Sequence, residues 1–117
     1  MRILLVHNTL NDSVSISGVL REYVNMARVW MAEGHTVDFL TGRVAQAQLR
    51  DLAPECGRLS SDDFFDATAQ LHQTWRHFPA YAWRCLSALR QPQTGYDVVY
   101  ATCPFVVETF CARVIAR

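Results

Sequence analysis

Residues 1–42 read MRILLVHNTL NDSVSISGVL REYVNMARVW MAEGHTVDFL TG, and this stretch decides the fold. It opens on an apolar run at residues 2–6, which is typical of a strand buried on both faces of a parallel sheet. Residues 7–17 are rich in Asn, Asp, Ser and Thr and predict a loop. β-Branched and aromatic residues return at 36–41 and predict a second strand. The stretch therefore predicts a right-handed β-α-β unit.

An amphipathic helix joins these two strands. Ser17 is a good N-cap residue, and Gly34 stands where a left-handed C-cap residue is favoured. The helix therefore begins near Gly18 and runs for about four turns. Apolar residues recur along it at intervals of three and four: Val19, Leu20, Tyr23, Val24, Ala27, Trp30 and Met31. This stripe predicts a helix that packs one face on the sheet.

The middle of the chain carries weaker signals. Residues 44–52 predict a short helix and residues 56–60 a short third strand, with Pro54 between them as a breaker. Apolar residues at helical spacing then extend over residues 64–89. We expect Pro79 to break or kink this stretch into two helices.

The last part of the chain repeats the strand-to-helix pattern. Residues 96–101 (YDVVYA) predict a strand, and residues 105–116 predict a helix after a Thr-Cys-Pro junction. The predicted fold class is α/β: a parallel sheet with helices on both faces and strand order 3-2-1-4. A further parallel strand is expected after the last helix, so we interpret residues 1–117 as a single, incomplete domain.

Composition narrows the classes of function. The chain has 117 residues, and Lys+Arg and Asp+Glu balance at 11 each, with arginine supplying all of the basic side chains. This balance gives no global attraction to nucleic acid, so we predict no nucleic-acid partner. No apolar run reaches the roughly 18 to 20 residues that a membrane span needs.

Four cysteines stand apart in the sequence: Cys56, Cys85, Cys103 and Cys111. None of them forms a CxxC pair, and no histidine lies near them at the spacing of a metal site. No secretory leader precedes them, so we predict reduced thiols in a cytoplasmic protein. The sequence predicts no metal site, and it lacks the GxGxxG loop of a dinucleotide cofactor.

Three segments together resemble a known family. These are MRILLV at residues 1–6, REYVNMARVWMAEGHTV at 21–37 and YDVVYATCP at 96–104. They resemble the N-terminal domain of GT-B glycosyltransferases of the family-4-like kind. Within that group the chain looks most like bacterial enzymes that transfer a sugar from a nucleotide donor during polysaccharide or lipopolysaccharide assembly.

The resemblance implies two Rossmann-like domains that bind different substrates. The first holds mainly the acceptor, a sugar or a lipid-linked sugar, and the second holds mainly the nucleotide-sugar donor. This chain would be a partial first domain, inactive alone, with the donor motif and the usual active-site histidine beyond Arg117. His7 and His35 are not assigned that histidine's role. Many relatives place two adjacent glycines before the first helix, whereas this sequence has only Gly18.

Candidate binding residues follow from the fold class. Ligands of open parallel sheets bind beyond the carboxyl ends of the strands, where the strand order reverses, and the N-terminus of the first helix attracts phosphate or hydroxyl groups there. The candidates that lie on the two converging loops and the first helical turn are Asn8, Ser15, Ser17, Gly18, Arg21 and Thr102. Capping and turn formation is the alternative role for each serine and asparagine. We assign no catalytic residue.

The sequence also indicates two kinds of surface interaction, with a membrane and with a second copy of the chain. Trp75, Arg76, Trp83 and Arg84 combine indole rings with guanidinium groups, as in helices that lie at the inner membrane surface. The alternative, a core helix with arginines that extend to water, is the more frequent meaning of such a pattern. An incomplete sheet would also expose the edge of the 96–101 strand, which favours self-association.

A second hypothesis for the whole chain comes from a different class. It is a stand-alone α/β module that binds a ligand or a partner without catalysis. Such a module is expected to be monodisperse, without an exposed apolar sheet edge.

Overall fold

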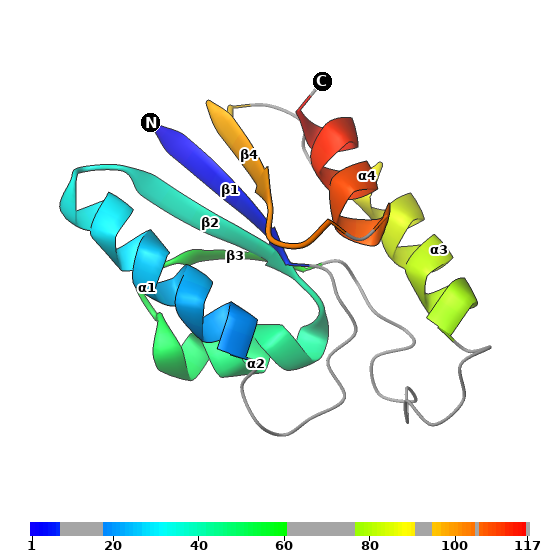
Figure 1. Ribbon diagram of the computed structural model, residues 1–117, viewed down its shortest axis with the longest axis horizontal. Helices are drawn as coiled ribbons and strands as arrows, with labels where there is room; N and C mark the ends of the chain where they lie inside the picture. Colours follow the sequence, from blue (N-terminus) through cyan, green and yellow to red (C-terminus); the bar gives the residue numbers. More distant parts are fainter. Residues whose placement is uncertain (8–17, 61–76, 91–94, 105, 117) are drawn as a thin grey trace.

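Figure 1 shows the computed structural model, in which residues 1–7, 18–60, 77–90, 95–104 and 106–116 are described. The strands are β1 (Arg2–His7), β2 (Thr36–Thr41), β3 (Gly57–Ser60) and β4 (Val98–Ala101). The helices are α1 (Gly18–Ala32), α2 (Arg43–Leu52), α3 (His77–Ala88) and α4 (Val106–Ile115). Strands and helices alternate along the described chain, which confirms the predicted α/β class.

The four strands form one parallel sheet in the order β3-β2-β1-β4, as predicted. β1 is central: Ile3 lies opposite Val37 of β2 on one side and opposite Val98 of β4 on the other. The strand order reverses beside β1, because the chain moves outward to β2 and β3 and then returns to the other side for β4 (Figure 1). The carboxyl ends of β1 and β4 are therefore neighbours.

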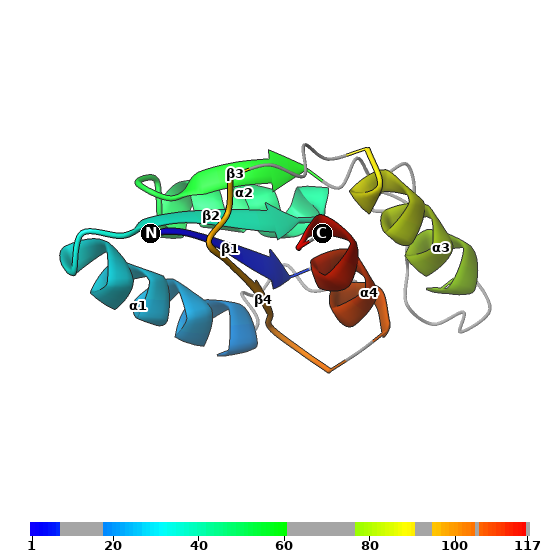
Figure 2. The same cartoon turned by 90° about the horizontal axis from the view of Figure 1, so that it is seen from above.

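α1 and α2 cover one face of the sheet (Figure 2). The side chains of Leu5 and Phe39 point to this face and have no exposed surface. Val24 of α1 and Leu49 of α2 pack in the same core cluster. Full burial of one such side chain stabilises the fold by about 1.5 to 3 kcal/mol, so this cluster is a main source of stability.

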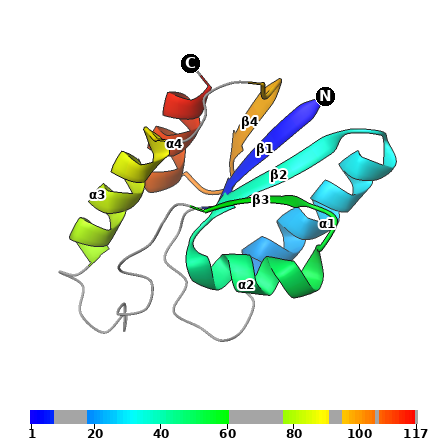
Figure 3. The ribbon, with the colours of Figure 1, turned by 180° about the vertical axis from the view of Figure 1, so that it is seen from behind.

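α4 covers the opposite face, and α3 packs beside α4 (Figures 1 and 3). Leu4, Val6 and Leu40 point to this side and are fully buried. Cys111 and Ile115 are the buried apolar residues that α4 contributes to this core. The alternation of Ile3 and Leu5 with Leu4 and Val6 between two cores explains why β1 is apolar at every inner position.

The turn after α1 forms as the sequence predicts. Gly34 has a φ of 88°, a left-handed conformation that glycine adopts without steric cost. Its amide donates to the Met31 carbonyl, and the amide of His35 donates to the Trp30 carbonyl. These bonds satisfy carbonyl groups at the helix end and turn the chain directly into β2. Ser17, the predicted N-cap, lies outside the described residues.

The boundary predicted at Tyr96 is corrected, whereas the predicted helix before Pro79 stays a prediction. Pro79 lies in the first turn of α3, where proline is tolerated because the first amides of a helix have no intrahelical partner. The segment before His77 lies outside the described residues. β4 begins at Val98 instead of Tyr96, because Tyr96 turns its side chain toward Asp38 and precedes the strand.

A polar cluster joins the strands near their amino ends; we call Arg2, Asp38, Tyr96 and Asp97 the amino-end cluster. Arg2 pairs with the Asp38 carboxylate at 3.3 Å, and its guanidinium carbon lies 4.8 Å from the centre of the Tyr96 ring. The Tyr96 hydroxyl donates to Asp38 at 2.9 Å. The amide of Arg2 donates to the Asp97 carboxylate at 2.7 Å, and the amide of Asp97 donates to the Arg2 carbonyl at 2.9 Å.

β4 is an edge strand within the described part of the chain, where its only partner is β1. Val98 and Tyr100 are 40% and 43% exposed. The structure therefore presents an apolar sheet edge of the kind that favours association with another strand.

Candidate functional site

A buried hydrogen bond joins the carboxyl ends of β1 and β4. The Nδ1 atom of His7 lies 2.9 Å from the Thr102 hydroxyl, and the side chains of both residues are buried. The Thr102 hydroxyl lies 3.1 Å from the Val6 carbonyl, to which it donates. The hydroxyl has one proton, so it accepts from Nδ1–H, and a neutral His7 ring then carries its unshared electron pair on Nε2.

Two tyrosines complete this site. The hydroxyl of Tyr23 on α1 donates to the Thr102 carbonyl at 2.9 Å. The rings of Tyr23 and Tyr100 lie 5.8 Å apart, tilted by 53°. Burial, followed by the interaction with Tyr100, raises the pKa of the Tyr23 hydroxyl. We call His7, Tyr23, Tyr100 and Thr102 the carboxyl-end cluster.

The bond from Tyr23 places the beginning of α1 beside this cluster (Figure 1). Gly18, the first residue of α1, is exposed, and a Cβ added to it would meet no atom within 4 Å. Arg21, one turn later, is also exposed. The amides of the first helical turn carry a partial positive charge, which favours a hydroxyl or phosphate oxygen in this open space.

Of the predicted site residues, Thr102 belongs to the carboxyl-end cluster, while Gly18 and Arg21 are exposed on α1, the helix whose Tyr23 bonds to Thr102. The Thr102 hydroxyl is hydrogen-bonded to the His7 ring and to the Val6 carbonyl. The other three candidates, Asn8, Ser15 and Ser17, lie outside the described residues.

Sequence reasoning missed the contributions of His7, Tyr23 and Tyr100. The alternation of β1 offers a signal for His7, because its side chain shares the orientation of Ile3 and Leu5, toward α1. Tyr23 was counted only as part of the apolar stripe, although a tyrosine on a buried helix face needs a partner for its hydroxyl.

Other predicted features have simple positions. His35 lies at the amino edge of β2, where its Nδ1 is 3.5 Å from the Met1 amino group, so it is remote from the carboxyl-end cluster. None of the four cysteines is joined in a disulfide. Among the described residues, no group of three or more His, Cys, Asp or Glu side chains is arranged to hold a metal ion. The carboxyl-end cluster offers an imidazole, two phenol groups and a hydroxyl group, all of which can form hydrogen bonds.

Comparisons with known proteins return no relative. The chain matches no known protein family, no curated protein and no solved structure. Within the described residues, no helix is both long enough and apolar enough to cross a membrane.

Proposed function

We propose that this chain forms the acceptor-binding part of a glycosyltransferase that moves a sugar from a nucleotide-sugar donor to a sugar or lipid-linked acceptor. The observation that carries the proposal is the His7–Thr102 hydrogen bond at 2.9 Å, which fixes two polar side chains where the strand order reverses. Open parallel sheets bind ligands at this position. The sequence resemblance supplies the reaction, and bacterial polysaccharide or lipopolysaccharide assembly is its proposed setting.

The geometry favours an acceptor rich in hydroxyl groups. The carboxyl-end cluster has no carboxylate or ammonium group, so it would not repel a neutral sugar or require a charged one. Arg21 and the first amides of α1 add positive potential that suits a phosphate on a lipid-linked acceptor. The role proposed for these residues is binding and orientation; the proposal assigns catalysis to groups outside the described residues.

The proposal is tested by following amide and histidine-ring NMR signals while simple sugars and sugar phosphates are added. We expect shifts at Gly18, Thr102 and the His7 ring. Gly18→Val should abolish them, because its side chain enters space that is open in the free protein. Asp38→Asn, in the amino-end cluster, is the matched control and should bind normally. Shifts confined to other regions would contradict the proposed site.

Activity assays address the assignment of catalysis. We expect residues 1–117 alone to show no sugar transfer from a panel of nucleotide-sugars. Measurable transfer that survives in Gly18→Val would contradict both the proposed site and the assignment of the catalytic groups to another part of the enzyme.

The second candidate is a stand-alone module that binds a ligand without catalysis. The exposed apolar edge at Val98 and Tyr100 argues against it, because an isolated module is expected to protect such an edge. We propose that this edge mediates self-association of the isolated chain. Sedimentation velocity over a range of concentrations checks this: a monomer at every concentration would favour the stand-alone module, and association that Tyr100→Lys removes would support the first proposal.

A further inference from the structure

Helices α3 and α4 present an apolar surface away from the sheet. Leu86 lies on α3 and Leu89 follows the end of this helix, while Val106, Phe110, Arg113 and Val114 lie on α4. We call these six residues the outer α3–α4 surface. Leu86, Leu89, Val106 and Phe110 are 56%, 50%, 78% and 41% exposed. Contiguous exposed apolar side chains of this size are unusual unless another surface covers them.

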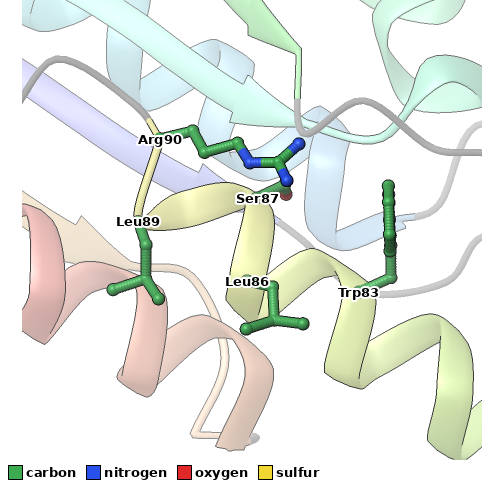
Figure 4. Close-up of a pocket in the computed structure, with 5 residues that line it drawn as sticks. All are labelled: Trp83, Leu86, Ser87, Leu89 and Arg90. Atoms are coloured by element: carbon green, nitrogen blue, oxygen red, sulfur yellow. The ribbon is translucent and has the colours of Figure 1, made fainter.

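Two hollows meet on this surface at Leu89. One, of about 210 Å³, lies along α3 and is lined by Trp83, Leu86, Ser87, Leu89 and Arg90 (Figure 4). The other, of about 360 Å³, lies between the helices and is lined by Leu89, Phe110, Arg113 and Val114. Each hollow therefore combines apolar walls with one arginine.

The arginines are placed as in interfacial helices. The guanidinium carbon of Arg90 lies 5.9 Å from the centre of the Trp83 ring. Arg113 is exposed in the last turn of α4. Such side chains keep their apolar stems on the protein while the charged group remains in water or meets an anion.

Acidic groups are missing from this face among the described residues. α3 contains no Asp or Glu, and the single acidic residue of α4, Glu108, has no exposed surface. The chain as a whole is neutral, with 11 basic and 11 acidic residues. Positive charge and apolar surface are therefore concentrated together on α3 and α4.

We propose that the outer α3–α4 surface binds peripherally to an anionic lipid membrane. Leu86, Leu89 and Phe110 enter the boundary between headgroups and acyl chains, and Arg90 and Arg113 meet lipid phosphates. Relative to the sequence prediction, the contact is centred on α4 and the end of α3. Trp83 borders it, Trp75 and Arg76 lie outside the described residues, and the side chain of Arg84 is not described.

A second copy of the chain fits this surface less well. In a twofold dimer the same patch faces itself, so the arginines of both copies would be gathered in one interface with no exposed carboxylate from α3 or α4 to offset their charge. Anionic phospholipid supplies the opposite charge and apolar chains together. This distinction favours the membrane as the occupant.

The experiment is co-sedimentation of the chain with vesicles of phosphatidylcholine alone and of phosphatidylcholine mixed with phosphatidylglycerol. We expect binding to the mixed vesicles. Arg113→Gln should lower the partition coefficient about fivefold. The pair Leu86→Gln/Phe110→Gln should lower it about tenfold or more.

Matched controls separate this surface from the rest of the molecule. Val29→Gln changes an apolar residue on α1 that is 57% exposed, and it should bind vesicles like the wild type. Gly18→Val should also bind normally, so failure at the acceptor site and failure at the membrane surface are distinguishable. Thermal melts confirm that each variant is folded.

Three results would overturn the proposal. The first is absence of binding to mixed vesicles. The second is equal binding by the wild type and the Leu86→Gln/Phe110→Gln variant. The third is a concentration-dependent dimer that Phe110→Gln abolishes while vesicle binding is unchanged, which would assign the surface to a second copy.

Discussion

The two ends of the sheet are built from different chemistry. At the amino end, the Arg2 guanidinium pairs with Asp38, which also accepts from Tyr96, and the Asp97 carboxylate accepts from the backbone amide of Arg2. At the carboxyl end, the four described residues of the cluster, His7, Tyr23, Tyr100 and Thr102, carry no carboxylate, and the helix that carries Tyr23 begins at the exposed Gly18. The polar groups at both ends are bonded within the fold, but the carboxyl end also has the exposed Gly18 at the start of α1, where we propose that a ligand binds.

This difference separates stability from binding. Substitutions at the amino end should reduce the free energy of unfolding and leave ligand binding unchanged in the folded protein. Substitutions around Gly18 should do the reverse.

Gly57→Val should destabilise the protein most. A Cβ at Gly57 would lie 1.8 Å from Oδ1 and 2.8 Å from Cγ of Asp38, so it would displace the carboxylate from Arg2 and Tyr96. We expect a loss of about 3 kcal/mol in the free energy of unfolding. Urea denaturation measures it, with Gly18→Ala as the control that should change stability little. Equal stability of the two variants would mean that Asp38 is not held in place.

The thiols at the two ends should differ in reactivity. Cys56, just before β3, is buried, and burial raises its pKa from 9.0 to about 11. Its thiolate fraction near neutral pH is therefore about a hundredfold below the ordinary value. Cys103, just after β4, is only half-buried. Alkylation by iodoacetamide, followed by peptide mass spectrometry, should label Cys103 first; labelling of Cys56 at the same rate would contradict the description of its burial.

Thr102→Val should have a moderate effect on stability. The substitution keeps the shape and removes the hydroxyl that accepts from His7 and donates to Val6. Leaving a buried imidazole N–H without this acceptor should cost about 1 to 2 kcal/mol. The His7 ring signals should also shift in the NMR spectrum. Thr36→Val, at an exposed position, is the control. Equal stability of the Thr102→Val and Thr36→Val proteins would mean that the His7–Thr102 hydrogen bond does not stabilise the fold.

The smallest expected effect is a loss in the free energy of unfolding at alkaline pH, caused by ionisation of Tyr96 in the amino-end cluster. Burial, followed by the hydrogen bond to Asp38, raises the pKa of Tyr96 from 10.0 to about 12. The neutral hydroxyl is favoured in the folded state, so its contribution is complete below pH 10 and is lost as the pH rises toward 12. Tyr96→Phe should cost about 1 kcal/mol at neutral pH and should reduce this alkaline loss. Urea denaturation at several pH values compares the two proteins; identical pH profiles would exclude Tyr96 as the cause.

The elements of the fold could be predicted because their signals are local. The apolar run of β1, the stripe of α1 and the glycine at position 34 each depend on residues close in sequence. The strand order followed from the handedness of parallel crossovers. The start of β4 was missed because Tyr96 has the composition of a strand residue. Its side chain instead bonds to Asp38, a contact that the sequence does not show.

The candidate site could be predicted only in part because its contacts are distant in sequence. His7 and Thr102 are 95 residues apart, and Tyr23 and Thr102 are 79 apart. The general rule for parallel sheets identified Thr102 and Gly18 by position. No pattern in a single sequence specifies which polar side chain will meet them. Asp38, an acidic residue within an apolar strand, was the available signal for the amino-end cluster.

The first of the two cores has a consequence for the order of folding. Its buried members all come from residues 3–56, whereas the core on the opposite face joins Leu4 to Ile115. Contacts that close short loops form before those that close long ones. During synthesis, β1, β2 and β3 can therefore assemble with α1 and α2 while the rest of the chain is still being made. One edge of β1 then remains unpaired until β4 has been synthesised. During this interval the growing chain is most prone to associate wrongly with other chains.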